Sequence, residues 1–292
     1  MTKLSSPRRA IAAACLVPLI GALAPAALAQ DREPLTASEP KGVNLDVGFA
    51  TAYVFRGWNV FQEDSQLDPH GMIAPGLSWR IGDSNVTVGY WAAYQLTGTN
   101  IGATTDEALN AEQDLYVTYD LELPNDLAMA FGLTAYVYPA ADPDVMGAAV
   151  PLYLEPSVGV TYSTAVDLGL SVHYLAGLQD QPSIWGYSYL YLHPTVGKSF
   201  DLNEHLALDL GLGYGFKLFN EGIEGRDNVH DVTVTGALPI QAGGPGAYVA
   251  PGLGLAWTNV EDVTDDSGAV IDDKGFADGI AVWGSLNLGM DL

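Results

Sequence analysis

The residues best able to do chemistry in this sequence are five histidines and thirty-five acidic side chains, set against eleven basic ones. A histidine beside a serine or a carboxylate is the usual machinery of hydrolysis, so the surroundings of each histidine come first. No serine stands two positions after any of them, where a His-x-Ser pair on one strand would place it. The histidines are His70, His173, His193, His205 and His230, and the residues two positions on are Met72, Leu175, Thr195, Ala207 and Val232.

Other arrangements that signal an enzyme are equally weak. The sequence has no Gly-x-Ser-x-Gly run, and the neighbours His230 and Asp231 would point to opposite faces of a strand. The sequence therefore predicts no catalytic activity. Residues brought together across strands remain the one open route to an active site.

Metal and cofactor sites have little support. The single cysteine, Cys15, lies in a segment that we expect to be removed, so no disulfide or thiol ligand is expected in the mature chain. One acidic loop offers oxygen ligands for Ca²⁺, but its spacing departs from the Asp-x-Asp-x-Asp-Gly pattern, which makes a solvated loop the default. Its carboxylates are Asp262, Asp265, Asp266, Asp272 and Asp273. We expect no cofactor and no resident metal.

The first 29 residues read as an export signal. Lys3, Arg8 and Arg9 precede an apolar stretch, and Ala27-Leu28-Ala29 has the small-x-small form that signal peptidase accepts. Without these three cations the chain has 8 basic against 35 acidic residues, a net charge of −27. Such a protein repels nucleic acid. Residues 30–42 are polar with two prolines and are expected to form a short periplasmic lead-in.

Beyond residue 42 the pattern is strict alternation. From Leu206 to Leu218 the even positions are apolar, whereas the odd ones carry Ala, Asp, Gly or Lys. A strand of this length suits a tilted crossing of a bilayer, which takes about 9 to 11 residues, better than a soluble sandwich. No stretch after Ala29 is long and apolar enough for a membrane helix. The sequence therefore predicts a β-barrel, since lipid accepts only helices and closed barrels.

The alternation divides residues 43–292 into about twelve strands of a single all-β, antiparallel, up-and-down transmembrane barrel. Short turns alternate with longer acidic loops, as in outer-membrane barrels, where the turns are periplasmic and the loops face outward. The expected strands are 43–56, 70–81, 84–96, 111–123, 127–138, 150–163, 166–178, 186–200, 204–219, 228–240, 246–258 and 278–292. The last strand alternates up to Leu292. Barrels that the assembly machinery recognises commonly end in an aromatic residue, so the leucine departs from that pattern.

The first strand carries a more specific signal. The run Tyr53-Val54-Phe55-Arg56-Gly57 resembles the opening of the TorF-type porin family, whose mature chains begin with a strand ending in Tyr-x-Phe-Arg-Gly. The resemblance continues loosely through the later hairpins, as at Glu112-Gln113-Asp114 and Tyr136-Val137-Tyr138-Pro139. It implies an outer-membrane barrel but does not narrow the solute, because the substrates of that family are generally unassigned.

If the apolar face of each strand meets lipid, the opposite face points into the lumen. Burying so many carboxylates in a dry core would cost several kcal/mol each, so a hydrated lumen is expected. Arg56 is expected to face inward at the external end of the first strand, and three tyrosines form one inward row. The candidates for the lumen are Arg56, Asp114, Glu155, His173, Tyr187, Tyr189, Tyr191, His193, Asp209, Lys217 and Asp231.

These features favour an outer-membrane channel for passive diffusion of small hydrophilic solutes, with cation preference from the acidic lumen. The alternative is a non-conducting barrel whose acidic loops bind a surface partner. A water path past Gly211, Gly213, Gly252 and Gly254 would favour the channel. Bulky rings and ion pairs that meet across the barrel axis would instead plug the lumen and favour the non-conducting barrel. The expected partners are outer-membrane lipids with lipopolysaccharide, the barrel assembly machinery and small solutes.

Overall fold

A computed structural model describes residues 42–61, 70–96, 111–139, 152–177, 188–219, 229–242, 246–259, 263–264, 270–272 and 279–292. The export signal and the lead-in, residues 1–41, lie outside these ranges and remain predictions. Within the described part, no helix is long and apolar enough to cross a membrane.

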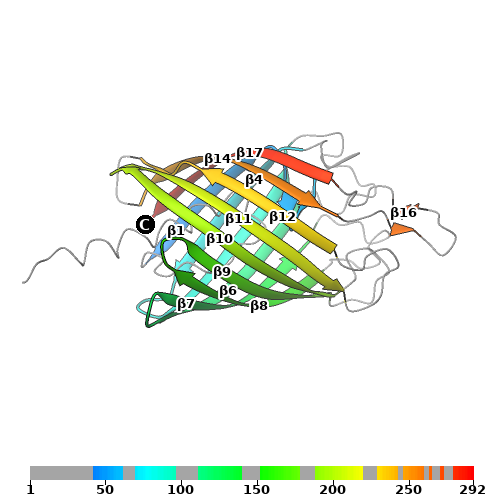
Figure 1. The fold of residues 1–292 in the computed structure, drawn as a ribbon, viewed down its shortest axis with the longest axis horizontal. Helices are drawn as coiled ribbons and strands as arrows, with labels where there is room; N and C mark the ends of the chain where they lie inside the picture. The colour runs from blue at the N-terminus through cyan, green and yellow to red at the C-terminus, as the bar shows by residue number, and fades with distance from the viewer. Residues whose placement is uncertain are drawn as a thin grey trace, which may run out of the picture.

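Twelve antiparallel strands close into one barrel in the described part of the chain (Figure 1). Each strand pairs with its neighbours in sequence, and β1 pairs with β17 to close the ring, from Asn44 opposite Asp291 to Ala50 opposite Ser285. The prediction of a twelve-stranded up-and-down barrel is therefore confirmed. The strands are β1 (Val43–Ala50), β4 (Met72–Arg80), β5 (Val86–Gln95), β6 (Ala111–Leu123), β7 (Leu127–Val137), β8 (Leu152–Ser163), β9 (Asp167–Gly177), β10 (Tyr189–Asn203), β11 (Leu206–Phe219), β12 (Val229–Ala237), β14 (Tyr248–Thr258) and β17 (Gly279–Asp291).

The connections sort the barrel into two ends. Short turns follow β4, β6, β8 and β10 at the end where β1 begins and β17 finishes, and we call this the turn end. At the opposite loop end the strands are joined by the longer connections. The predicted end of the strand 186–200 was wrong: β10 runs through Asn203, so the turn expected at 201–203 falls at Glu204 and His205. A bulge between Asp201 and Asn203 shifts the register and lengthens the strand.

Five short strands of the described part lie outside the barrel ring. The strand β13 (Ile240–Gln241) extends the β12–β14 turn, and β15 (Val263–Thr264) pairs with β16 (Val270–Asp272). The strand β2 (Val54–Phe55) pairs with β3 (Trp58–Asn59) to form a tight hairpin directly after β1.

The hairpin corrects the expected first strand, 43–56. The barrel strand β1 ends at Ala50, and residues 52–61 fold back into the lumen, where Tyr53, Val54 and Arg56 are buried. Arg56 and Gly57 form the tip with positive φ of 48° and 84°, a conformation that glycine adopts without strain. We call residues 52–61 the inner hairpin.

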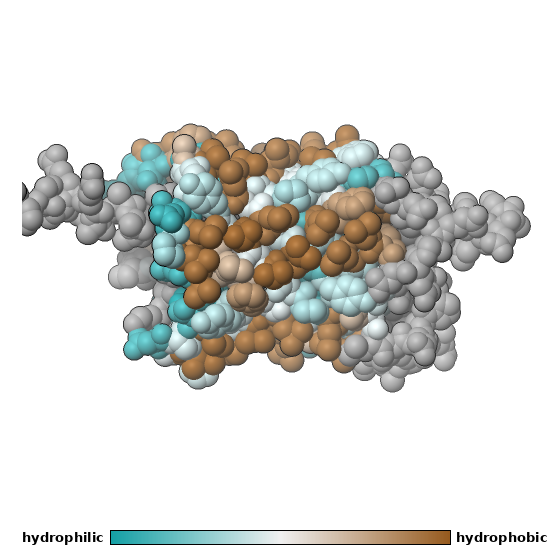
Figure 2. Space-filling view, turned by 60° about the horizontal axis from the view of Figure 1, so that its bottom comes forward, coloured by the Kyte–Doolittle hydropathy of each residue, from teal (hydrophilic) through white to brown (hydrophobic). Residues whose placement is uncertain are grey.

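The outer wall is apolar. Large hydrophobic side chains with substantial exposure occur on strands all round the barrel, among them Leu115, Leu133, Leu212 and Val282. Figure 2 shows them as continuous hydrophobic rows along the tilted strands, with hydrophilic residues at the turn end. Exposed apolar surface of this extent is unfavourable in water and favourable in lipid. The arrangement matches the apolar band of a membrane-spanning barrel.

Candidate functional site

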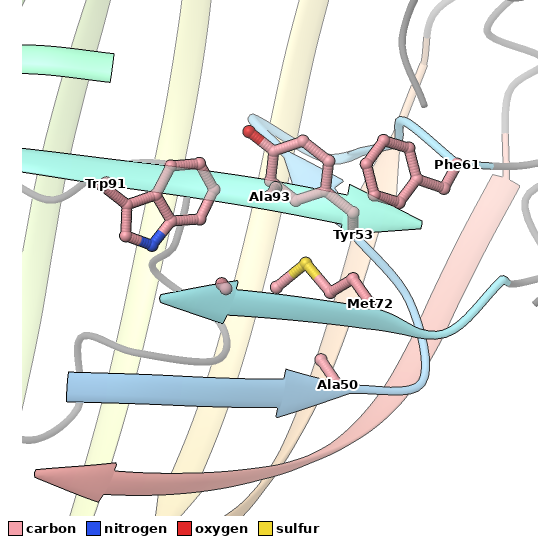
Figure 3. Close-up of a cluster of buried hydrophobic side chains, with 7 residues drawn as sticks. Ala50, Tyr53, Phe61, Met72, Trp91 and Ala93 are labelled. Atoms are coloured by element: carbon pink, nitrogen blue, oxygen red, sulfur yellow. The ribbon is translucent and has the colours of Figure 1, made fainter. Parts of the chain in front are cut away.

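The inner hairpin packs against the wall of the loop-end half. The Tyr53 ring lies 5.0 Å from Phe61 and 5.8 Å from Trp91, measured between ring centroids. Met72 from β4 and Trp91 from β5 complete this cluster (Figure 3). On the other side, Ala52 and Val54 pack against β14 and β17 in a cluster that includes the buried Trp283 ring. These contacts hold the hairpin across the lumen.

Arg56 at the hairpin tip reaches the strand on the far side of the barrel. Its Nη2 donates to both carboxylate oxygens of Glu155 on β8, each at 2.8 Å, and its Nη1 donates to the Tyr189 hydroxyl at 2.9 Å. The guanidinium carbon also lies 4.4 Å from the centre of the Tyr191 ring. A planar cation held by a carboxylate and stacked on rings is the preferred environment of a buried arginine.

A second buried ion pair lies on the wall beside the hairpin tip, and its lysine also binds the hairpin backbone. Lys217 on β11 is fully buried, and its Nζ donates to Asp231 Oδ2 at 2.8 Å and to the backbone carbonyl of Arg56 at 2.7 Å. The Tyr191 hydroxyl donates to the other Asp231 oxygen at 3.1 Å. The structure thus brings six residues predicted for the lumen into one network around the hairpin tip: Arg56, Glu155, Tyr189, Tyr191, Lys217 and Asp231.

A carboxyl pair lies on β6 beside this network. Glu112 and Asp114 are two residues apart and face inward, and the Tyr53 hydroxyl donates to Glu112 Oε1 at 2.8 Å. Asp114 lies opposite Trp91 in the register of β5 and β6, and its Oδ1 is buried without a hydrogen-bond partner among the described residues. Glu112 escaped the sequence analysis although its position, two residues before Asp114, places it on the same face.

His173 on β9 bridges an acid and a hydroxyl. Its Nδ1 lies 3.0 Å from Glu155 Oε1, and its Nε2 lies 3.0 Å from the Ser171 hydroxyl. Ser171 stands two positions before His173, whereas a His-x-Ser pair would place the serine two positions after the histidine. The spacing is still a signal in the sequence, since residues i and i−2 of a strand share a face.

The turn-end half of the lumen is lined by smaller side chains. Some inward residues there are partly exposed, namely Ser157, Gly169, Thr195, Gly197, Ser199, Gly211 and Ser285. Other inward residues of the same half are buried, among them Ser78, Thr87, Asp120, Thr161 and Asn287. A side chain added at Gly197 would meet only the Leu210 carbonyl, at 3.9 Å. The carboxylate of Asp209 faces this half, is fully buried and forms no ion pair in the described part. We call this space the vestibule.

The glycines proposed as markers of a water path are partly covered. The His193 ring lies over Gly213, and the Trp283 ring lies over Gly254. With two ion pairs and several rings around the hairpin tip, the loop-end half meets the condition set for a plug. The turn-end half, with Gly197 and Gly211 partly exposed, does not.

The remaining candidates fall outside this site. Tyr187 lies outside the described residues, as do Asp262, Asp265, Asp266 and Asp273, and only the backbone of Asp272 is described. The acidic-loop calcium site therefore stays a prediction. In the part of the chain that the structure describes, no group of three or more His, Cys, Asp or Glu could hold a metal ion.

A closed ring of strands with an apolar outer wall and a polar, acidic inner face is the architecture by which bacterial outer membranes are spanned. The protein is an outer-membrane β-barrel. Its outer strand faces contact membrane lipid.

Solved structures with a similar barrel include the NanC porin, with 8% identity and a TM-score of 0.47 over 86% of this chain and 98% of that one. An outer-membrane channel from Pseudomonas putida F1 is 9% identical with a TM-score of 0.48, over 90% of this chain and 99% of that one. LpxR from Salmonella typhimurium is 12% identical with a TM-score of 0.47, over 85% of this chain and 100% of that one. These identities are too low to transfer a function.

No known protein family matches the chain, and no curated protein matches it. The resemblance to the TorF-type porins at Tyr53-Val54-Phe55-Arg56-Gly57 therefore remains a prediction. The structure adds one observation about those residues: they form the inner hairpin rather than the end of a strand.

Proposed function

We propose that the protein is an outer-membrane channel for passive diffusion of small hydrophilic solutes, with its loop end facing the exterior and the inner hairpin closing the lumen. The observation that carries this proposal is the division of the lumen. The turn-end half carries the small, partly exposed side chains of the vestibule, and a single inserted hairpin fills the loop-end half. Because the hairpin pairs only with itself and adds no strand to the barrel, it can move without breaking the wall.

Cation preference is part of the proposal. Among the described residues the buried charged groups are seven carboxylates, Asp46, Glu112, Asp114, Asp120, Glu155, Asp209 and Asp231, and two cations, Arg56 and Lys217. Both cations form ion pairs at the hairpin tip. The excess of negative charge gives the lumen a potential that attracts cations and repels anions. Transport of this kind needs no chemistry from the lumen, so the principal function is not enzymatic.

The second candidate is a non-conducting barrel whose external loops bind a surface partner. It is favoured by the same hairpin, because two buried ion pairs and packed aromatic clusters rigidify the loop-end half. Lipopolysaccharide at the outer wall and the assembly machinery at the final strand β17 are partners in both cases.

Single-channel conductance of the refolded mature protein in a planar bilayer separates the two candidates. We expect brief openings in the wild type and long openings when residues 52–61 are replaced by a Gly-Ser linker of equal length. A salt gradient across the bilayer should give a reversal potential of cation-selective sign. A correctly folded barrel that stays silent with and without the hairpin would leave the non-conducting barrel as the function.

A further inference from the structure

Ser171, His173 and Glu155 form a continuous chain of hydrogen bonds on the inner wall. The serine and the histidine are two residues apart on β9 and share the inward face, while Glu155 comes from the neighbouring strand β8. The distances are 3.0 Å from Ser171 Oγ to His173 Nε2 and 3.0 Å from His173 Nδ1 to Glu155 Oε1. The transport proposal makes no use of this chain.

The partners of Glu155 decide the tautomer of His173. The carboxylate accepts two hydrogen bonds from Arg56 Nη2 and one from the Tyr136 hydroxyl, an environment that stabilises its ionised form. An ionised carboxylate can only accept, so the His173 nitrogen beside it, Nδ1, carries the proton. The other nitrogen, Nε2, then presents a lone pair to the Ser171 hydroxyl. This is the arrangement in which a histidine activates a serine as nucleophile.

The position of Ser171 decides from which side a substrate would approach it. It lies where the buried loop-end half meets the vestibule, and its cross-strand neighbours are Gly159 on β8 and His193 on β10. Below it on the same wall, Gly169 and Thr195 are partly exposed. Ser171 itself is 2% exposed, at the closed end of the vestibule. We expect only a small group to reach it, from the side of the partly exposed Gly169 and Thr195.

We propose that Ser171 is the nucleophile of an esterase site for short acyl esters, with His173 as its general base and Glu155 as the residue that orients the base. The inference goes beyond transport and revises the sequence-based expectation of no catalysis. It does not depend on the barrel conducting.

The reaction uses only the ester and water. Ser171 Oγ bonds to the carbonyl carbon while its proton moves to His173 Nε2, and the carbonyl electron pair moves to the oxygen. When the carbonyl re-forms, the bond to the alcohol oxygen breaks, and that oxygen takes the proton from Nε2. Water then attacks the acyl-serine with the same histidine as base, releasing the carboxylic acid and restoring Ser171. Glu155 stays ionised throughout.

A small alkyl fluorophosphonate tests the nucleophile directly in the refolded, detergent-solubilised mature protein, where both ends of the barrel are open to solvent. We expect one adduct per chain, which peptide mass spectrometry locates at Ser171. Ser171→Ala should abolish labelling, and His173→Gln should slow it by about 100-fold or more. Ser157→Ala is the matched control, since this inward serine lies opposite His173 in the register of β8 and β9 and should leave labelling unchanged.

Heat-modifiable mobility on gels shows that each variant is folded before it is scored. Hydrolysis of p-nitrophenyl acetate should follow the same order among the variants. The proposal is overturned if the folded wild type gains no adduct, if the adduct lies at another residue, or if His173→Gln labels as fast as the wild type. Conductance recorded on Ser171→Ala, which we expect to be unchanged, keeps this result separate from the fate of the channel.

Discussion

Arg56 and Glu155 form a buried ion pair across the lumen, 99 residues apart in sequence, with Nη2 donating to both carboxylate oxygens at 2.8 Å. The arginine comes from a hairpin that follows the first strand, and the glutamate comes from β8 on the opposite wall. The pair therefore ties the inserted segment to the barrel. Breaking it leaves a buried charge without its partner, which is the most costly kind of change at this site.

Glu155→Gln should lower the free energy of unfolding by about 3–5 kcal/mol, because the amide cannot neutralise the buried guanidinium. Urea unfolding in detergent, followed by tryptophan fluorescence, measures the change. The matched control is Glu122→Gln at the exposed end of β6, which should change the free energy of unfolding by only about 0.5 kcal/mol or less. In a planar bilayer Glu155→Gln should also open more often than the wild type. Equal stability of the two variants would show that the ion pair does not anchor the hairpin.

Gly57→Ala should displace the inner hairpin while the barrel stays closed. A Cβ at this position would lie 2.5 Å from the Asp231 Cβ and 3.1 Å from the Thr258 Cβ, and the backbone φ is +84°. The backbone strain alone costs about 1–3 kcal/mol. Gly82→Ala is the control, since it also has a positive φ but nothing within 4 Å of its Cβ. We expect Gly57→Ala alone to become sensitive to protease within residues 52–61, and equal cleavage of both variants would contradict this.

Asp209→Asn should reduce cation selectivity. The carboxylate is fully buried on the wall of the vestibule and forms no ion pair in the described part of the chain, so its charge acts on the permeating ion without compensation. The reversal potential in a potassium chloride gradient, measured in the hairpin-replaced protein to ensure conduction, should move toward zero. The substitution should also stabilise the folded barrel, because an amide is less costly to bury than an unpaired carboxylate. An unchanged reversal potential would remove Asp209 from the selectivity determinants.

Leu212→Arg tests the depth of the apolar band. Leu212 lies near the middle of β11 with its side chain outward, so an arginine there should lower the free energy of unfolding in lipid by about 2–4 kcal/mol. Leu202→Arg, outward on β10 close to its end at Asn203, should cost only about 0–1 kcal/mol. Reversible urea titration in lipid vesicles compares the two. Similar costs at both positions would mean that the band does not lie where the exposed leucines place it.

Much of the wall could be predicted because its information is local. A period of two over Leu206–Phe219 specifies both a strand and the face that each side chain takes, and the structure places Asp209 and Lys217 on the inner side. Eleven of the twelve strands start and end within a few residues of their predicted bounds. Local alternation cannot, however, register a bulge, which is why the end of β10 was misplaced.

The hairpin could not be predicted, because Tyr53-Val54-Phe55-Arg56 continues the alternation of β1 without a break. A strand leaving the barrel and a strand folding back into it have the same local pattern. The choice depends on partners far along the chain: Glu155 for the guanidinium, Lys217 for the Arg56 carbonyl, and the pocket beside Trp91 for Tyr53.

The sequence by itself determined an acidic, strand-rich chain with an apolar outer face and an inner face of carboxylates and tyrosines, because composition and alternation need no knowledge of distant neighbours. Only the tertiary structure decided that Arg56 meets Glu155, that the loop-end half is filled, and that Ser171, His173 and Glu155 meet. Strand register and the course of a loop set which side chains touch, and both follow from the closure of the whole barrel.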